Sequence, residues 1–189
     1  LCRVACGLDA AILGESQVLA QVAAALGHGV AAHSVDPLLK DVFRTAIRCA
    51  EHARRTVWAS YRAADIGTAA ASGADDALDG LAGLSAVVVG AGDVAELSVR
   101  ALEARGIARL TVMNRTRENA ETLAGRHGAE AAGLDRLPRL LPEADVVIIA
   151  TRAPRVVLGA DVVREALASR QGRSIVIVDT ALPRNVDPD

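Results

Sequence analysis

The chain has 189 residues, of which 51% are hydrophobic and 23% are charged, and its formal net charge is −2. This length is enough for one ordinary domain or two small ones with a packed core, and the apolar fraction excludes an intrinsically disordered chain. Because positive charge is not in excess, binding to nucleic acid through overall charge is excluded as well. The few aromatic residues all lie before residue 62, so the rest of the chain cannot stack bases on aromatic rings.

The cysteine and histidine residues do not form a metal-binding motif. Cys2, Cys6 and Cys49 contain no C-x-x-C pair, which favours reduced thiols in a cytosolic protein. His28 and His33 lack the i, i+4 spacing that places two ligands on one helix face, so no metal site is predicted. No apolar run approaches the roughly 20 residues that a membrane span needs. We therefore expect a cytoplasmic protein without membrane contact.

Residues 1 to 62 carry helix signals. Apolar residues over Ile12–Leu26 follow helical spacing, and Gly27 is predicted to end this helix. A second helix is predicted to begin at Asp36-Pro37, because Asp caps free N–H groups and Pro at the first helical position removes no needed donor. Its end is expected between Arg55 and Arg62.

A connecting segment is expected over residues 63–83, which are rich in Ala, Gly and Asp. Within it, Thr68–Leu78 shows a weak helical pattern. The composition changes after this segment, so a second domain is predicted over residues 84–189.

In that second domain, short apolar runs alternate with helical patterns. The predicted strands are Ser85–Val89, Leu110–Met113, Ala129–Ala132, Asp145–Ala150 and Ser174–Asp179. The predicted helices are Val94–Ala104, Arg117–Arg126, Leu134–Leu141 and Asp161–Ser169. Strands that are apolar throughout are buried on both faces, as in a parallel sheet covered by helices. The sequence therefore predicts an α/β domain with a doubly wound parallel sheet of the Rossmann type, preceded by a helical segment.

The sharpest motif is Gly90-Ala91-Gly92-Asp93-Val94-Ala95, which leaves a predicted strand and enters a predicted helix. That context is the one a dinucleotide-binding turn requires. Gly90 permits the tight turn, Gly92 lets the backbone approach a pyrophosphate, and Ala95 lets the helix pack close to the strand. The first N–H groups of the helix would then bind the phosphates.

The end of the second strand indicates which dinucleotide binds. NAD-dependent enzymes place an acidic residue there to hold the ribose 2′-hydroxyl, whereas this chain has Asn114-Arg115-Thr116. A guanidinium at this position suits a 2′-phosphate, so NADPH is the predicted cofactor. A second interpretation is compatible with the first: Thr116 caps the next helix and Arg115 is a solvated charge.

Two further polar positions leave alternatives open. Thr151 follows the fourth strand, so it either lies beside the cofactor at the carboxyl edge of the sheet or belongs to an ordinary strand exit. In the helical half, the polar residues Glu15, Ser16, Gln17 and Gln21 form either a binding surface or a solvated helix start.

Several blocks of the sequence together resemble glutamyl-tRNA reductase. They are Leu1-Cys2-Arg3-Val4-Ala5-Cys6-Gly7-Leu8-Asp9-Ala10, Leu13-Gly14-Glu15-Ser16-Gln17-Val18-Leu19-Ala20-Gln21, Asn114-Arg115-Thr116, Ala144-Asp145-Val146-Val147 and Asp179-Thr180-Ala181-Leu182-Pro183-Arg184-Asn185-Val186-Asp187-Pro188. The resemblance covers nearly the whole chain. It implies NADPH-dependent reduction of glutamyl-tRNA to glutamate-1-semialdehyde in tetrapyrrole synthesis, through a cysteine thioester. It also implies substrate binding by Ala10, Glu15, Ser16, Gln17 and Gln21, where Ala10 replaces the serine of the family pattern.

Other features of that family are not found in this sequence. Its nucleophile lies in a Thr-Cys-Asn-Arg motif that does not occur here, so no catalytic residue is assigned to this chain. Val57–Asp65 is expected to be an insertion, and the family's dimerisation helices would follow Asp189. We therefore expect a central fragment, inactive alone, of a reductase that forms a homodimer and contacts the downstream aminomutase.

Two alternative functions remain from the sequence. One is another NADPH-dependent dehydrogenase of the same fold, such as a shikimate-dehydrogenase-like protein, although Lys40 and Asp41 would be a poor catalytic pair on one helix. The other is a non-catalytic NADPH-binding homologue. The arginines of the second helix could contact tRNA phosphates, but a solvated helix face is the default interpretation. They are Arg44, Arg48, Arg54, Arg55 and Arg62.

Overall fold

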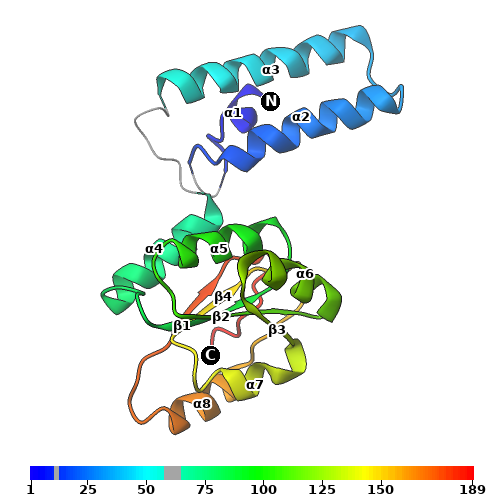
Figure 1. Cartoon of the computed structure of the whole chain (residues 1–189). Coiled ribbons are helices and arrows are strands. Elements are labelled where there is room, and N and C mark those ends of the chain that lie inside the picture. The colour runs from blue at the N-terminus through cyan, green and yellow to red at the C-terminus, as the bar shows by residue number, and fades with distance from the viewer. Residues whose placement is uncertain (11–12, 58–64) are drawn as a thin grey trace. The chain divides into compact units, whose positions relative to one another are not determined.

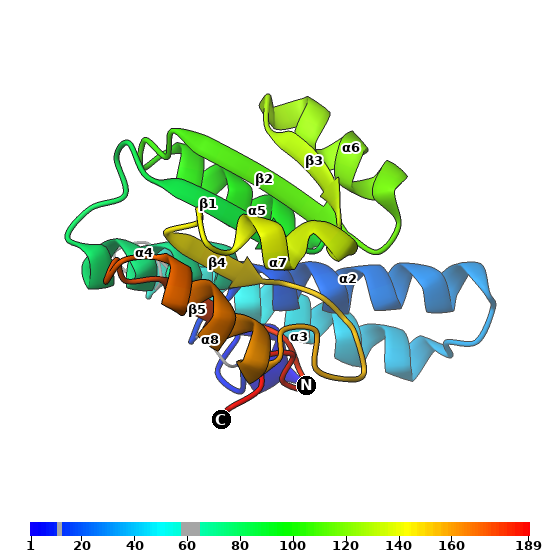
Figure 2. The ribbon, with the colours of Figure 1, turned by 90° about the horizontal axis from the view of Figure 1, so that it is seen from below.

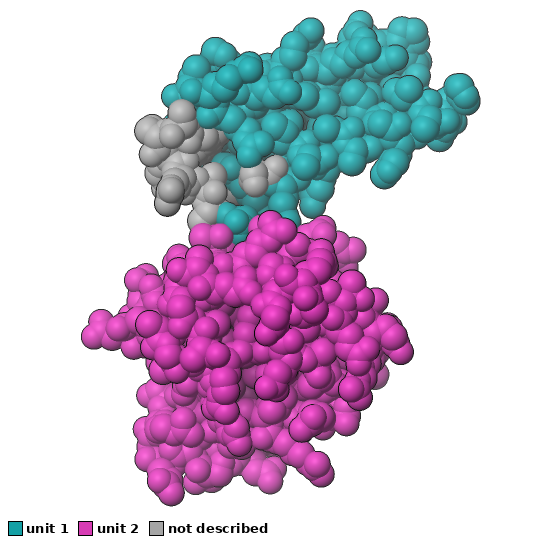
Figure 3. All heavy atoms as spheres, viewed as in Figure 1, with its two compact units in different colours: residues 1–65 teal, residues 66–189 magenta. Residues whose placement is uncertain are grey.

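The computed structural model describes residues 1–10, 13–57 and 65–189. The chain forms two compact units, Leu1–Asp65 and Ile66–Asp189 (Figures 1 and 3). Most of the predicted insertion over Val57–Asp65 lies outside the described residues. Among the described helices, none is long and apolar enough to cross a membrane.

The first unit is helical, as predicted. It contains α1 (Cys2–Ala5), α2 (Ser16–Ala31) and α3 (Pro37–Thr56). The prediction that Gly27 ends α2 was wrong, because the helix continues for four residues beyond it. A glycine inside a helix costs only about 1 kcal/mol relative to alanine, and the alanine-rich sequence before Gly27 favours helix strongly enough to carry through it.

The predicted start of α3 is confirmed. An Asp36 carboxylate oxygen accepts a hydrogen bond of 2.7 Å from the backbone N–H of Leu39, and Pro37 occupies the first helical position. The helix ends at Thr56, inside the predicted interval. Ala46 and Ala50 on its inner face are fully buried, and with Ala5 and Val22 they form the small core of the first unit.

The second unit contains one sheet of five parallel strands, which confirms the predicted fold class. The strands are β1 (Ser85–Val89), β2 (Arg109–Asn114), β3 (Glu130–Gly133), β4 (Val146–Ile149) and β5 (Val176–Asp179). Their order is β3-β2-β1-β4-β5. The chain adds β2 and β3 on one side of β1 and then β4 and β5 on the other side, so the strand order reverses between β1 and β4. Ligands of doubly wound sheets bind at the carboxyl ends of the strands at such a reversal.

Helices cover both faces of this sheet (Figures 1 and 2). One face carries α4 (Ile66–Leu78), α5 (Asp93–Glu103) and α6 (Arg117–His127). The other face carries α7 (Leu137–Leu140), which follows a short 3-10 helix, and α8 (Ala160–Ser169). The segment 63–83, expected to be a connection, therefore contains α4, a helix of the second unit.

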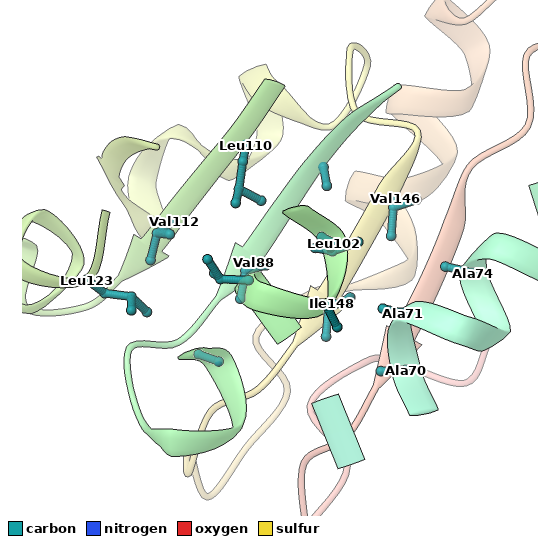
Figure 4. Packing of buried hydrophobic residues seen from close by; sticks show 14 of the residues in the cluster. Ala70, Ala71, Ala74, Val88, Leu102, Leu110, Val112, Leu123, Val146 and Ile148 are labelled. Atoms are coloured by element: carbon teal, nitrogen blue, oxygen red, sulfur yellow. The ribbon is translucent and has the colours of Figure 1, made fainter. Parts of the chain in front are cut away.

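Alternating residues of the strands face two hydrophobic clusters. Val88 and Ile148 pack with Leu102 of α5 on one side (Figure 4), and Val87 and Ile149 belong to the cluster on the other side. Small residues allow close helix packing on the first side: a Cβ at Gly67 in α4 would lie only 2.5 Å from the backbone nitrogen of Ser98 in α5. Both faces of the sheet are therefore packed against helices, which positions the ends of its strands.

A polar network joins the beginnings of β1 and β4. One Asp145 carboxylate oxygen accepts hydrogen bonds of 3.0 Å from both the N–H and the hydroxyl of Ser85. The other oxygen lies 3.4 Å from the guanidinium of Arg170, whose side chain is buried. Partial burial alone would raise the pKa of Asp145, but the Ser85 hydrogen bonds and the charges of Arg170 and Arg173 outweigh it and lower that pKa.

Candidate functional site: a dinucleotide-binding edge

The glycine turn after β1 has the geometry that the sequence motif predicts. Gly90 has a φ of +130°, which favours glycine, and its N–H donates a hydrogen bond of 2.7 Å to the carbonyl oxygen of Met113 in β2. A Cβ at this position would overlap the carbonyl oxygen of Ala150 at the end of β4. Gly90 thus lets β1, β2 and β4 end close together.

Gly92 leaves space where the next residues turn into α5. It is exposed, its φ is an ordinary −94°, and a Cβ there would have no atom within 4 Å. It is the N-cap residue of α5, whose first N–H groups have no partner inside the helix. The turn therefore provides an open approach to a helix N-terminus, which is the arrangement that binds a pyrophosphate.

The other residues of the motif support this turn. Ala95 is fully buried and lets α5 lie close to the sheet, and Ala91 packs against the same hydrophobic cluster. The carbonyl oxygen of Val94 accepts the hydroxyl of Ser98 at 2.8 Å. Asp93 is exposed in the first turn of α5, where a negative charge interacts favourably with the helix dipole.

The end of β2 presents a cation beside this turn. The Asn114 side-chain amide donates to the carbonyl oxygen of Thr116 at 3.0 Å, which fixes the loop. Thr116 is the N-cap residue of α6 but makes no side-chain capping bond, so it caps only through its backbone. Arg115 is exposed, and within the described residues its guanidinium makes no hydrogen bond or ion pair. In contrast, Arg117 pairs with Glu121 at 2.8 Å.

Thr151 lies at the end of β4 and its hydroxyl is part of a local network. The hydroxyl donates a short hydrogen bond of 2.5 Å to the side-chain oxygen of Asn185, and its oxygen accepts one of 3.0 Å from the N–H of Ala153. Asn185 is fully buried. Sequence reasoning did not assign Asn185 to the site, because the two residues are 34 positions apart and no local pattern links them.

The segment after β5 is attached to the same edge. The Asp179 carboxylate accepts the backbone N–H groups of Ala181, Asn185 and Val186 at 2.7 to 3.0 Å. The hydroxyl of Thr180 donates to the carbonyl oxygen of Ile149 in β4 at 2.8 Å. These bonds hold the chain that follows β5 against the end of β4.

The residues that the resemblance assigns to the substrate lie in the first unit, near a contact between Gly7 and Gly14. The N–H of Gly14 donates to the carbonyl oxygen of Gly7 at 3.0 Å, and both glycines have positive φ. A Cβ at Gly7 would lie 2.9 Å from the Cα of Gly14. This contact holds Gly7 against Gly14, and the next residue, Glu15, is the N-cap residue of α2.

Glu15 has an electrostatic environment that favours its neutral form. Burial raises the pKa of this carboxyl group, and the nearby negative charge of Asp65 raises it further. Gln17 is half-buried and Gln21 is exposed, and their spacing places both on one face of α2. Ala10, which lies between Gly7 and Gly14 in the chain, is half-buried, and Ser16 is the first residue of α2.

The described residues contain no group of three or more His, Cys, Asp and Glu side chains suited to a metal ion. The polar groups at the carboxyl edge of the sheet instead suit an organic anion: open helix N–H groups, a glycine turn and an exposed guanidinium.

Each of the two units matches a known protein-family model. Residues 1–57 match the family model "Glutamyl-tRNAGlu reductase, N-terminal domain", and residues 72–189 match the family model "Shikimate / quinate 5-dehydrogenase". The glutamyl-tRNA reductase of Thermus thermophilus is 40% identical over 188 residues, and that of Methanopyrus kandleri is 42% identical over 188 residues. These matches cover 100% and 99% of this chain, but 47% and 46% of the relatives.

Solved structures are similar to the chain as well. The glutamyl-tRNA reductase from Methanopyrus kandleri superimposes with a TM-score of 0.63 and 40% sequence identity, covering 99% of this chain and 47% of that one. The nucleotide-binding domain of the reductase from Thermoplasma volcanium, at 19% identity and a TM-score of 0.50, shares the fold of the second unit over 64% of this chain. The chain spans about half the length of the curated relatives that it matches. Over its whole length the chain is therefore similar to about half of a glutamyl-tRNA reductase, and its residues 72–189 belong to the family that the model "Shikimate / quinate 5-dehydrogenase" describes.

Proposed function

We propose that this chain supplies the NADPH-binding domain and part of the substrate-binding domain of a glutamyl-tRNA reductase. The proposed reaction reduces the glutamyl group of glutamyl-tRNA to glutamate-1-semialdehyde for tetrapyrrole synthesis. Similarity to glutamyl-tRNA reductases over the whole chain supports the reaction class, and the carboxyl edge of the sheet supports the cofactor. The cysteine that forms the thioester in this family is not assigned to any residue of this chain.

The residues at the carboxyl edge of the sheet fit the cofactor. Gly90 and Gly92 give the backbone turn and the open space that a pyrophosphate needs. The exposed Arg115 would hold the 2′-phosphate, and Asn114 stands where NAD-dependent enzymes have an acidic residue. When bound, NADPH would supply a hydride to the acyl carbonyl carbon.

The observation that carries the choice of NADPH is the contrast between two neighbouring arginines. Arg117 is paired with Glu121, whereas Arg115 has no partner among the described residues. A guanidinium without a partner at this edge remains available to form charge-assisted hydrogen bonds with a phosphate. The family match alone implies a nicotinamide dinucleotide but does not distinguish NADPH from NADH.

The first unit has a feature that suits the aminoacyl end of the substrate. The half-buried Glu15 carboxyl lies near Asp65, and both burial and that negative charge raise its pKa. A bound ammonium group would offset the repulsion between the two carboxylates. We assign the α-amino group of the glutamyl ester to this position. Gln17 and Gln21, which share one face of α2, are available to hydrogen-bond other groups of the substrate.

The test compares two arginine variants in titrations with NADPH and NADH. Arg115→Ala should weaken NADPH binding by about 1.5–3 kcal/mol, or about 10- to 150-fold, because hydrogen bonds to a charged group are lost. NADH binding should remain nearly unchanged. Arg117→Ala is the matched control and should leave both affinities within a factor of about two, since its partner is Glu121. If Arg115→Ala weakened the binding of NADPH and NADH equally, the assignment of Arg115 to the 2′-phosphate would be contradicted.

The resemblance further predicts a homodimer, contact with the downstream aminomutase and a cytoplasmic location for the complete protein. These properties of the whole protein remain predictions, because the chain spans about half of its relatives.

A further inference from the structure

The amide group of Asn185 is held in one orientation by carbonyl groups of the loop after β4. Its nitrogen donates to the carbonyl oxygens of Ala153 at 2.9 Å and Arg155 at 3.0 Å. Carbonyl oxygens can only accept, so the amide cannot turn over without losing both bonds. Its oxygen is therefore fixed toward Thr151.

This orientation determines what the Thr151 hydroxyl can offer to a ligand. A hydroxyl has one proton and two lone pairs. The proton is used in the 2.5 Å hydrogen bond to the Asn185 oxygen, and one lone pair accepts the N–H of Ala153. One lone pair of the Thr151 hydroxyl oxygen remains unused, and the residue is half-exposed. The hydroxyl can therefore accept one further hydrogen bond but cannot donate one.

The position of Thr151 along the sheet indicates which part of a dinucleotide would meet it. Arg115 follows β2, the glycine turn follows β1, and Thr151 follows β4, on the opposite side of β1 from β2. With the 2′-phosphate at β2 and the pyrophosphate at the glycine turn, the other half of the dinucleotide extends over β4. That half ends in nicotinamide, whose carboxamide carries an NH₂ donor.

We propose that Thr151 accepts a hydrogen bond from the nicotinamide carboxamide NH₂, and that Asn185 is the positioning residue that holds the Thr151 hydroxyl as an acceptor. This inference rests on the proposed function, because it requires a nicotinamide dinucleotide at this edge. Asn185, which follows β5, would touch no ligand and would nevertheless determine how the nicotinamide end of the cofactor is recognised.

The test uses NADP⁺ and its 3-acetylpyridine analogue, in which a methyl group replaces the carboxamide NH₂. The 189-residue chain should bind NADP⁺ about three- to tenfold more tightly than the analogue, the factor expected for one neutral hydrogen bond. In Thr151→Val and Thr151→Ala this ratio should fall to about one, and Thr151→Ser should retain it. Asn185→Ala should lower the ratio at least twofold, because the hydroxyl can then rotate.

The matched control is Thr122→Val, which removes an exposed hydroxyl from α6, where it donates to the carbonyl oxygen of Glu118. This variant should keep the wild-type ratio. If wild type binds NADP⁺ but Thr151→Val and Thr151→Ala keep the full ratio, the contact is wrong. If only Asn185→Ala keeps it, the positioning role is wrong. If wild type binds neither dinucleotide, the proposed function itself fails.

Discussion

The carbonyl oxygen of Ala150 lies so close to Gly90 that the Cβ of any other residue at position 90 would overlap it. The two residues follow β4 and β1, the pair of strands between which the order of the sheet reverses. Strand pairing brings them together, since the N–H of Ala150 donates to the carbonyl oxygen of Val89 at 2.7 Å. The glycine at position 90 is therefore required by the fold itself, before any ligand binds.

The two glycines of the turn should respond differently to alanine. Gly90→Ala introduces an overlap with Ala150 at a φ of +130°, so we expect it to destabilise the second unit by about 2 kcal/mol or more. Gly92→Ala meets open space at an ordinary φ, so its free energy of unfolding should stay within about 0.5 kcal/mol of wild type. Its NADPH affinity should nevertheless fall, because the methyl group blocks the approach of the pyrophosphate.

Urea denaturation and NADPH titration of both variants check this prediction. A stable Gly92→Ala variant with weakened binding is the expected result. A Gly92→Ala variant that binds NADPH as tightly as wild type would show that the pyrophosphate does not approach the backbone here.

Two glycines of the first unit, Gly7 and Gly27, should also differ in how their replacement by alanine changes stability. Gly7→Ala should destabilise it by about 2 kcal/mol, because the φ of Gly7 is +73° and its Cβ would lie 2.9 Å from the Cα of Gly14. Gly27 lies inside α2, and a Cβ added there would have no atom within 4 Å. Gly27→Ala should therefore stabilise the helix by about 0.5–1 kcal/mol. Thermal denaturation followed by circular dichroism measures both, and a shift of equal sign in the two variants would refute the comparison.

The Asp145 network should make the stability of the second unit depend on pH in the acid range. The pKa of Asp145 is lowered in the folded protein, so its contribution is fully present above the unfolded value of about 3.9. That contribution is lost as the pH falls through the lowered folded pKa. Asp145→Asn should therefore be less stable than wild type at pH 6, and the difference should narrow below about pH 4.

Urea denaturation at several pH values from 6 downward provides the measurement for Asp145. A stability difference that stays constant across this range would show that ionisation of Asp145 does not stabilise the fold.

Local patterns were sufficient to predict most elements of the second unit. The strand at Ser85–Val89 was predicted with the same bounds as observed, because its residues are nearly all apolar and a glycine turn follows it directly. The start of α3 was predictable because Asp36 and Pro37 act within one turn of the helix. The glycine turn and the Arg115 position followed from the same kind of local signal.

The interactions missed by sequence reasoning are the long-range ones. The Thr151–Asn185 bond joins loops 34 residues apart, and each residue alone has an ordinary loop sequence. Gly27 carries a stop signal, but the alanine-rich sequence before it favours helix strongly enough for α2 to continue to Ala31. The weak pattern of α4 reflects its alanines and glycines, which are needed for close contact with α5 and carry little periodic signal.

The most direct test of the central claim is a calorimetric titration of the wild-type chain with NADPH and with NADH under identical salt conditions. We expect NADPH to bind with a dissociation constant at least about tenfold lower than that of NADH, because Arg115 forms charge-assisted hydrogen bonds with the 2′-phosphate. Equal affinities, or tighter binding of NADH, would contradict it.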